Sequence, residues 1–188
     1  YANVSVAASN KCGQAVPITN REFRVYFLRP LNVAAATGAE FQDAQGGNAS
    51  YADVADLLTF SDWRGVGFTG NNGWLYGYYE VKSVTLDSKN IETDLNGGFK
   101  NIDEIPGLSI KQVSNSDINI STPTVDNSAN ILTKVKSCLG KIEVRNSNNT
   151  TRDYRVKLPF TITYAWGQIS VTVEATVKAT LGQGSARK

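Results

Sequence analysis

The chain of 188 residues is 41% hydrophobic and 19% charged, a globular composition with slightly fewer charges than usual. Its net charge of +2 is too small to indicate nucleic-acid binding, and no apolar run reaches the length of a membrane span. The sequence contains no histidine, which excludes Ser-His-Asp and Cys-His nucleophiles as well as imidazole metal sites.

The first half of the chain predicts two strands and one helix. Alternating apolar residues predict strands over 3–8 and over 22–29, and Pro30 interrupts the second before it continues over 31–33. Small and polar residues over 34–49 predict an exposed loop. Ser50 is a suitable N-cap for a helix ending near residue 60, because the apolar residues that follow it have helical spacing, namely Val54, Leu57 and Leu58.

An aromatic strand is expected over 74–86. Trp74, Tyr76 and Tyr78 share one face of this strand, and a shift of phase near Tyr78 indicates a β-bulge. Shorter strands are expected further along, over 91–95, 108–113, 118–120, 131–135 and 142–144. The spacing of Ile131, Val135 and Leu139 also fits a helix, but the turn residues on either side favour the strand.

Residues 154–180 predict one long β-hairpin. Apolar and polar residues alternate on both sides of Trp166-Gly167, so each strand has one buried face and one solvent-exposed face. A two-residue turn there would pair Tyr164 with Ile169 and Phe160 with Val173, and burial of the apolar face would fix this register. Pro159 lacks an N–H, so we expect a ladder interruption or a bulge opposite Glu174.

These elements predict an all-β fold. Nine to eleven short strands, separated by turn signals, are typical of an antiparallel β-sandwich, immunoglobulin-like or jelly-roll-like, with one short inserted helix and a long C-terminal β-hairpin. We expect one domain over 1–188, with a division into 1–106 and 107–188 as the weaker alternative. Because the chain starts at Tyr1 without Met, we expect it to be the C-terminal part of a larger polypeptide.

The two cysteines do not indicate a metal site. Neither Cys12 nor Cys138 has a second cysteine nearby, and the chain has no histidine, which argues against zinc. A disulfide between them would close a loop over most of the chain and stabilise it by about 4–5 kcal/mol. The sequence leaves open whether this bond forms.

The carboxylates offer little catalytic chemistry. The acidic pairs are Asp53 with Asp56, Asp103 with Glu104 and Asp87 with Asp94, and their turn or surface-helix settings favour structural roles. We therefore expect no catalytic residues, no cofactor and no enzyme activity. Calcium is the one plausible ion, because oxygen ligands alternate in two turn-like segments, Asp117-Ile118-Asn119 and Asp94-Leu95-Asn96.

Four aromatic residues are candidates for an interaction site: Trp166, Trp74, Tyr76 and Tyr78. Exposed rings on the aromatic strand would stack on sugars or contact protein, whereas buried rings would fill the sandwich core. Trp166 lies at a hairpin tip, where a residue is usually exposed, so it indicates packing on a neighbouring loop or chain.

The ending Lys157-Leu158-Pro159-Phe160-Thr161-Ile162-Thr163-Tyr164-Ala165-Trp166-Gly167-Gln168 resembles the final hairpin of a group of immunoglobulin-like domains. Those domains form the C-terminal end of very large multidomain proteins, surface or phage-encoded, of gut-type and gliding bacteria. The stretch from Leu57-Leu58 to Asp62-Trp63-Arg64 and the segment Asp94-Leu95-Asn96-Gly97-Gly98 are also similar to that group. The resemblance implies a structural or adhesive role outside the cell or on a virion, and no chemistry.

The first functional hypothesis is a non-enzymatic structural or interaction domain. It would belong to an extracellular bacterial adhesin or filament, or to a phage particle, and would act through contacts with copies of itself or with neighbouring domains. It would lie outside the cell, on the cell surface or on a virion, with no nucleic-acid partner and no membrane span. The alternative is a carbohydrate-binding module that uses the aromatic strand to bind glycans.

Overall fold

The computed structural model describes residues 2–17, 22–25 and 30–179. The chain forms two compact units, Tyr1–Pro30 and Leu31–Lys188. Each unit has its own strand pairing, and the two are described separately below.

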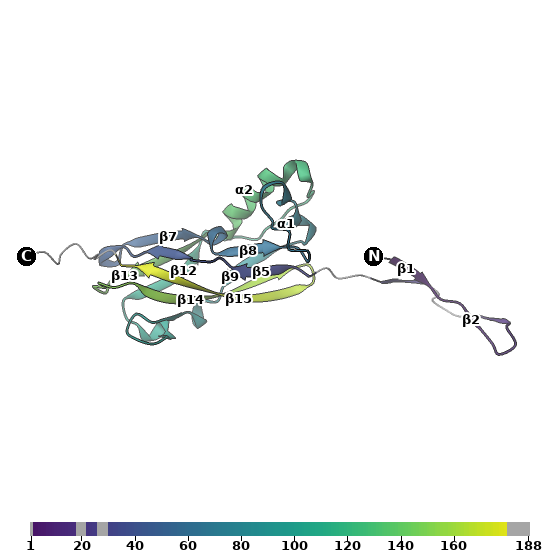
Figure 1. Cartoon of the computed structure of the whole chain (residues 1–188), viewed down its shortest axis with the longest axis horizontal. Coiled ribbons are helices and arrows are strands. Elements are labelled where there is room, and N and C mark those ends of the chain that lie inside the picture. Colours follow the sequence, from purple (N-terminus) through teal and green to yellow (C-terminus); the bar gives the residue numbers. More distant parts are fainter. Residues whose placement is uncertain (1, 18–21, 26–29, 180–188) are drawn as a thin grey trace, which may run out of the picture. The chain divides into compact units, whose positions relative to one another are not determined.

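The first unit is a two-stranded antiparallel ribbon (Figure 1). Strand β1 (Ala2–Ser5) pairs with β4 (Glu22–Val25), and β2 (Ala8–Ser9) pairs with β3 (Ala15–Val16). The turn between β2 and β3 is closed by Asn10, whose Oδ1 accepts hydrogen bonds from the N–H groups of Cys12 (2.9 Å) and Gln14 (3.0 Å). We call residues 2–17 and 22–25 the N-terminal hairpin. The strand expected over 22–29 is present over 22–25, and the rest of it lies outside the described residues.

The second unit, which we call the body, holds most of the secondary structure. Its strands are β5 (Asn32–Ala35), β6 (Glu40–Gln42), β7 (Ala49–Asp53), β8 (Leu58–Ser61), β9 (Ser83–Leu86), β10 (Glu92–Thr93), β11 (Lys100–Asn101), β12 (Leu108–Val113), β13 (Lys141–Asn146), β14 (Tyr154–Tyr164) and β15 (Gly167–Lys178). Its helices are α1 (Leu75–Tyr78) and α2 (Ser128–Leu139), together with the short 3-10 helices η1 (Gln45–Gly47), η2 (Val54–Asp56), η3 (Gly70–Asn72), η4 (Ser88–Asn90), η5 (Ile102–Glu104) and η6 (Val125–Asn127).

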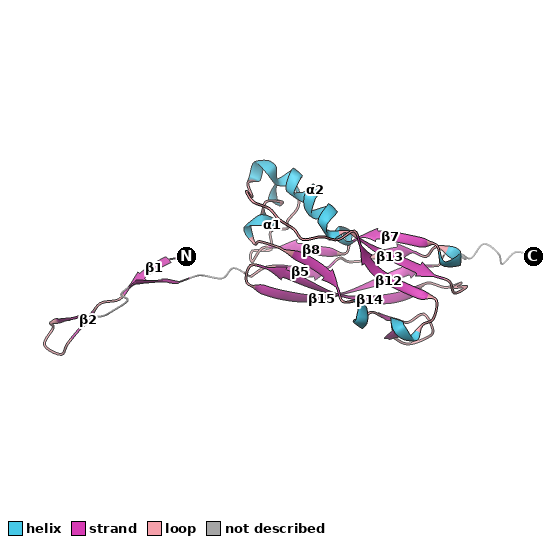
Figure 2. Cartoon of the chain, turned by 180° about the vertical axis from the view of Figure 1, so that it is seen from behind, coloured by secondary structure: helices cyan, strands magenta, loops and turns pink. Residues whose placement is uncertain are grey.

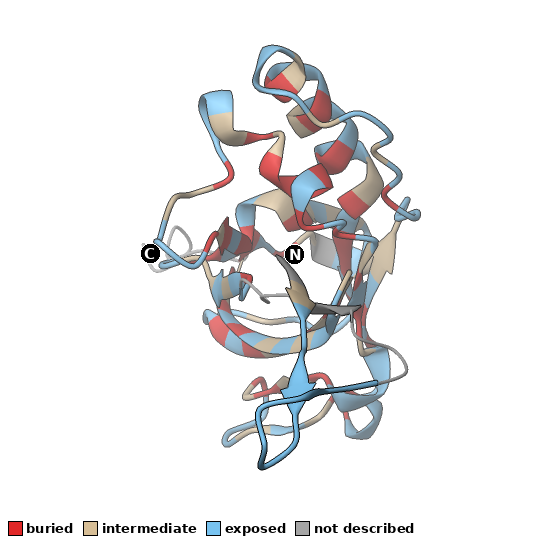
Figure 3. Ribbon diagram, turned by 90° about the vertical axis from the view of Figure 1, so that its right-hand side faces the viewer, coloured by how far each residue is buried: buried red, intermediate tan, exposed pale blue. Residues whose placement is uncertain are grey.

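The strands of the body form two packed layers, which confirms the predicted all-β sandwich. The large sheet has the order β11-β10-β14-β15-β6, and β9 also pairs with β14. A three-stranded sheet, β12-β13-β7, lies opposite, and β5 pairs with β8 beside β15 (Figures 1 and 2). Buried apolar side chains from both layers form one core (Figure 3). The β15–β6 pair is parallel, whereas every other pair is antiparallel among the described strands.

The terminal hairpin is present as predicted, but its expected register is wrong by two residues. The turn is Ala165-Trp166, so Tyr164 pairs with Gly167 and Phe160 with Val171. Gly167 has φ 136°, which a residue with a side chain rarely adopts, and this favours placing the glycine directly after the turn. A shift of two residues keeps every side chain on its original face. The predicted buried face of the hairpin is therefore correct, although the predicted residue pairs are wrong.

Pro159 does not interrupt the β14–β15 ladder. It lies opposite Thr172 rather than Glu174, inside a continuous register. The carbonyl of Pro159 accepts a hydrogen bond from the N–H of Asp87 (2.8 Å), so the backbone of Pro159 faces the end of β9. The missing N–H therefore lies where the β14–β15 ladder requires no donor.

The helix expected over 50–60 is wrong. These residues form strand β7, the 3-10 helix η2 and strand β8. Val54, Leu57 and Leu58 are buried because they lie around the sharp turn between these two strands. The predicted helix would have buried the same three side chains. The loop expected over 34–49 is also partly wrong, since it contains part of β5 and all of β6, and Phe41 is 2% exposed.

A helix replaces the strand expected over 131–135. In α2 the buried residues Ile131, Val135 and Leu139 recur every fourth position and form one apolar stripe. A capping box between Thr124 and Asn127 in the preceding turn starts the helical segment. Helix α2 packs against η2 and η3, outside the sheets (Figure 2). Among the described residues, no helix has both the length and the apolar character needed to cross a bilayer.

The aromatic strand expected over 74–86 is present only at its end. Residues 75–78 form the single turn of α1, and β9 starts at Ser83. The strand expected over 118–120 is also absent, although Ile118 is buried and donates its N–H to the carbonyl of Lys82 (2.7 Å). Of the other expected strands, β12 matches 108–113, whereas β10 covers only Glu92–Thr93 of 91–95 and β13 extends 142–144 to Lys141–Asn146.

One side chain joins the two layers at the β9–β12 corner. The amide of Gln112 accepts a hydrogen bond from the N–H of Leu86 (2.9 Å) and donates to the carbonyls of Val84 and Leu139, each at 2.9 Å. The Gln112 side chain thus forms hydrogen bonds with backbone groups at the outer edge of β9, where no other described strand pairs.

Candidate interaction surface

Residues 4–17 of the N-terminal hairpin form no core among themselves. No side chain of residues 4–17, whose burial the structure describes, is buried. Val6 and Val16 are 44% and 41% exposed. A two-stranded hairpin is marginally stable in water unless another strand or helix covers it. The hairpin therefore has the properties of a segment that is completed by contact with other protein surface.

The charge of the chain is divided unevenly between the two units. Residues 1–30 contain four basic side chains and one acidic side chain, a net charge of +3, so residues 31–188 carry −1 of the total of +2. The basic residues are Lys11, Arg21, Arg24 and Arg29, against Glu22. The N-terminal segment is thus the more basic part of the sequence.

Three exposed aromatic side chains lie at one end of the body. Trp166 is 49% exposed in the β14–β15 turn, and the N–H of Ala165 in that turn donates to the carbonyl of Tyr79 (3.2 Å). The neighbouring Tyr78 is 48% exposed. Trp63, 52% exposed, follows the end of β8, where Ser61 pairs with the first residue of β5. Figure 1 shows α1, the end of β8 and the β14–β15 turn at the same end of the body. We call Trp63, Tyr78 and Trp166 the aromatic end.

Trp63 is held outward by a buried carboxylate. Asp62 is 2% exposed, and its Oδ1 accepts hydrogen bonds from the N–H groups of Arg64 (2.8 Å) and Val66 (2.9 Å). The guanidinium of Arg64 also donates to Asp62 Oδ2 and lies over the Trp63 ring, 5.9 Å from its centroid. The exposed ring is therefore positioned by a fixed loop.

The four predicted contact residues do not form a single face. Tyr76 is only 8% exposed, and burial raises the pKa of its phenol well above the ordinary value. Trp74 is half-buried and meets Tyr78 edge to face, with ring centroids 5.6 Å apart and planes at 72°. Only Tyr78 and Trp166 of the four are exposed. Trp74, Tyr76 and Tyr78 thus lack the flat, open platform that stacking on sugars requires.

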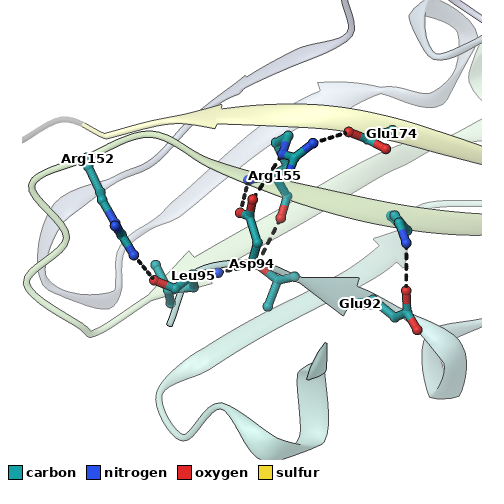
Figure 4. A network of polar contacts seen from close by, with 8 residues as sticks. Glu92, Asp94, Leu95, Arg152, Arg155 and Glu174 are labelled. Carbon is teal, nitrogen blue, oxygen red and sulfur yellow. Dashed lines mark hydrogen bonds and ion pairs between the residues drawn. The ribbon is translucent and has the colours of Figure 1, made fainter. Parts of the chain in front are cut away.

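A charged network covers the outer face of the large sheet (Figure 4). Two basic side chains of β14 there have acidic partners on neighbouring strands or loops, and the pairs are Arg155–Asp94 (2.9 Å), Arg155–Glu174 (3.1 Å) and Lys157–Glu92 (3.1 Å). A third basic side chain, Arg152, precedes β14 and donates to the carbonyl of Leu95 (3.3 Å). Arg155 and Lys157 also lie over the ring of Phe99. Most charges on this face are thus matched within the chain, which makes it a weaker docking surface than the hairpin or the aromatic end.

Three of the six acidic residues singled out in the sequence have structural partners, namely Asp53, Asp87 and Asp94. Asp53 pairs with Lys136 (3.0 Å), and Asp94 pairs with Arg155. Asp87 caps η4 by accepting a hydrogen bond from the N–H of Lys89. No group of three or more His, Cys, Asp or Glu side chains that could hold a metal ion occurs in the described parts of the chain. Cys12 and Cys138 are free thiols, the first exposed and the second half-buried.

Glu143 is the centre of a polar cluster on the outer face of the three-stranded sheet. Its carboxylate accepts hydrogen bonds from Arg145 Nε (2.8 Å) and the Tyr51 hydroxyl (3.0 Å), and it pairs with Lys111 (3.3 Å). The hydrogen bond from Arg145 is the largest cause that lowers the pKa of Glu143, to about 2.

This cluster predicts a dependence of stability on pH. Because the pKa of Glu143 is lower in the folded chain, its stabilisation is complete above the ordinary pKa of 4.5 and is lost as pH falls toward 2. We expect Glu143→Gln to unfold at lower urea concentration at pH 7 and to lose stability less steeply between pH 4.5 and pH 2. Glu104→Gln, at an exposed site, is the control. Parallel pH curves for wild type and Glu143→Gln would contradict this assignment.

Comparison with known proteins adds no relative: no protein-family model, curated protein or solved structure matches this chain. The candidate surface therefore depends on the geometry alone.

Two parts of the candidate surface were missed in the sequence. The N-terminal hairpin was interpreted as part of the sandwich, although the excess of basic residues over 1–30 was readable from the printed chain. Trp63 was noted in the sequence as one of the aromatic residues that flank a glycine-rich loop, but it was not one of the four contact candidates.

Proposed function

We propose that this protein is a non-enzymatic structural module that assembles through contacts with other protein subunits, in the first place with copies of itself. The observation that carries the proposal is the N-terminal hairpin, a described ribbon without buried side chains in residues 4–17. Burial of that ribbon on another subunit would supply the apolar contacts that it lacks. The aromatic end supports the same function, since tryptophan and tyrosine are enriched in protein interfaces.

The resemblance of the terminal hairpin to immunoglobulin-like domains suggests where such a module works. We propose an extracellular bacterial adhesin or filament, or a phage particle. Assembly in any of these settings requires neither a cofactor nor a catalytic group.

Assembly through the hairpin predicts that Val6 and Val16 strengthen self-association. Both valines are about half exposed, and burying the rest of each side chain contributes on the order of 1 kcal/mol. We expect the double variant Val6→Ser/Val16→Ser to raise the concentration at half-assembly at least about tenfold. Sedimentation equilibrium of the full chain measures this directly.

Val125→Ser is the matched control, because Val125 is an exposed valine of the body, 55% exposed. It should leave the assembly mass unchanged, and both variants should keep the thermal unfolding temperature of the wild type. A wild-type chain that stays at the monomer mass of 20.4 kDa at every concentration would overturn the proposed function.

A further inference from the structure

The chain contains two Asn-Gly dipeptides, Asn72-Gly73 and Asn96-Gly97. Such a dipeptide is open to attack of the glycine nitrogen on the asparagine side chain, because glycine has no side chain to shield its nitrogen. The attack expels the side-chain amide as ammonia and closes a five-membered cyclic imide, which water opens to aspartate or isoaspartate. The ring can form only where the backbone is able to rearrange, so the packing around each dipeptide decides whether it reacts.

Asn72-Gly73 is held on both sides by one buried serine. Ser128 is 2% exposed, and its hydroxyl donates to the carbonyl of Asn71 (2.8 Å) and accepts a hydrogen bond from the N–H of Trp74 (3.2 Å). Gly73 is itself buried, and a Cβ atom there would lie 2.5 Å from the carbonyl oxygen of Ser128 and from Cγ of Leu132. Closure of the imide would have to move this backbone against α2.

Asn96-Gly97 lies in an exposed turn between β10 and β11. The side chain of Asn96 is exposed and forms no hydrogen bond within the described residues. No atom lies within 4 Å of the position that a Cβ would occupy at Gly97 or Gly98. One hydrogen bond closes the turn, from the N–H of Gly97 to the carbonyl of Asp94 (3.0 Å). Imide formation breaks this bond, but water replaces it at an exposed position, so the net cost is small.

We propose that Asn96 is a site of spontaneous deamidation in the folded protein and that the fold protects Asn72. The nitrogen of Gly97 loses its proton to water and attacks Cγ of Asn96. The new N–Cγ bond replaces the Cγ–Nδ2 bond, and Nδ2 leaves as ammonia with a proton from water. Hydrolysis of the imide consumes one water and leaves a carboxylate at position 96. The net charge of the chain thus falls by one unit, from +2 to +1. This inference does not depend on the proposed function.

The new carboxylate arises beside the charged network of Figure 4. The guanidinium of Arg152 donates to the carbonyl of Leu95 (3.3 Å), the residue directly before Asn96. Arg152 has no acidic partner within the described residues, whereas Arg155 already pairs with Asp94. The negative charge therefore appears on an exposed turn next to a guanidinium that no carboxylate neutralises. We expect the modified chain to keep its fold, because exposed charge changes of this kind have small effects on stability.

Peptide mapping by mass spectrometry tests the proposal on the full chain. Folded protein is kept in mildly alkaline buffer, which favours loss of the nitrogen's proton, and aspartate and isoaspartate at positions 96 and 72 are followed with time. We expect Asn96 to react at least about tenfold faster than Asn72, which corresponds to a barrier lower by about 1.4 kcal/mol. Isoaspartate should be among the products, because the imide route produces it and direct hydrolysis of the side chain does not. Equal rates, or a faster reaction at Asn72, would overturn the proposal.

The same chain in concentrated guanidinium chloride is the matched control, since it keeps both dipeptides and removes the fold. Both sites should then react at similar rates, as expected if packing protects Asn72. A difference that persists in the unfolded chain would overturn the structural explanation. Reaction of Asn96 in guanidinium but not in the folded chain would show that the turn is protected, and the proposal would fail.

The variant Asn96→Asp gives a second readout that does not depend on reaction rates. It should unfold at the same temperature as the wild type, because the turn is exposed and lies beside Arg152. A clearly lower unfolding temperature would contradict the claim that the folded chain accommodates the modification.

Discussion

Gly140→Ala is expected to lower the free energy of unfolding by about 3–5 kcal/mol, the sum of backbone strain and a steric clash. Gly140 ends α2 with φ 68° and ψ −153°, a conformation that is essentially limited to glycine and costs about 1–3 kcal/mol for alanine. A Cβ atom at Gly140 would also lie 2.3 Å from the carbonyl oxygen of Val113 and 2.8 Å from the backbone nitrogen of Asn115. Backbone atoms cannot rotate away, so the strand β12 or the start of β13 must move.

Gly97→Ala is the matched control for this prediction. Gly97 also has a positive φ, of 84°, but no atom lies within 4 Å of the position that a Cβ would occupy. It should lose only the strain, about 1–2 kcal/mol. Denaturant unfolding of both variants measures the difference. Equal losses would show that the passage from α2 to β13 is not sterically restricted at Gly140.

Leu158→Ala is expected to cost about 3–4 kcal/mol, because it removes methyl and methylene groups from a rigid core. Leu158 is 0% exposed in the middle of β14, and its partner Val173 is also fully buried. No mobile neighbour can fill the cavity that Leu158→Ala leaves between the two sheets, since Val156 and Phe160 on the same face are buried as well.

Thr172→Ala tests the same hairpin from its exposed face. Thr172 lies opposite Pro159 and is exposed, so its replacement should change the free energy of unfolding by no more than about 0.5 kcal/mol. Guanidinium unfolding of both variants provides the comparison. If Thr172→Ala lowered the free energy of unfolding as much as Leu158→Ala, the assignment of the buried and solvent-exposed faces would be wrong.

The terminal hairpin was predictable because its signal is local. Two alternating runs on either side of a glycine define both strands and the face that each buries. The register was not predictable to better than two residues, because every shift of two preserves the buried face. The position of Gly167 directly after the turn resolves the ambiguity, and it depends on a backbone conformation that the sequence does not show.

Both helix errors concern segments whose apolar spacing fits a helix. Val54, Leu57 and Leu58 are spaced as in a helix, yet a short 3-10 turn between two strands buries the same side chains. In α2, the spacing of Ile131, Val135 and Leu139 fitted a helix, but the turn residues around 131–135 were given more weight and a strand was predicted. The capping box at Thr124 and Asn127 was the unused signal.

The candidate surface was the least predictable part. Tyr76 and Trp74 were expected on one face with Tyr78, but the turn of α1 directs Tyr76 into the core. Trp166 was correctly expected to be exposed, because a two-residue turn leaves little cover. The pairing of β7 with β13 joins residues more than 80 positions apart in the sequence, and no local pattern gives that information.

Hydrogen exchange in the N-terminal hairpin, measured as a function of protein concentration, tests the central claim most directly. If the hairpin is completed by a second copy, amides of residues 2–17 and 22–25 should exchange quickly in dilute solution and become protected at concentrations where the mass increases. The protection of β14 and β15 should stay constant over the same range. Hairpin protection that is the same at every concentration would contradict the claim, since the ribbon would then be stable without a partner.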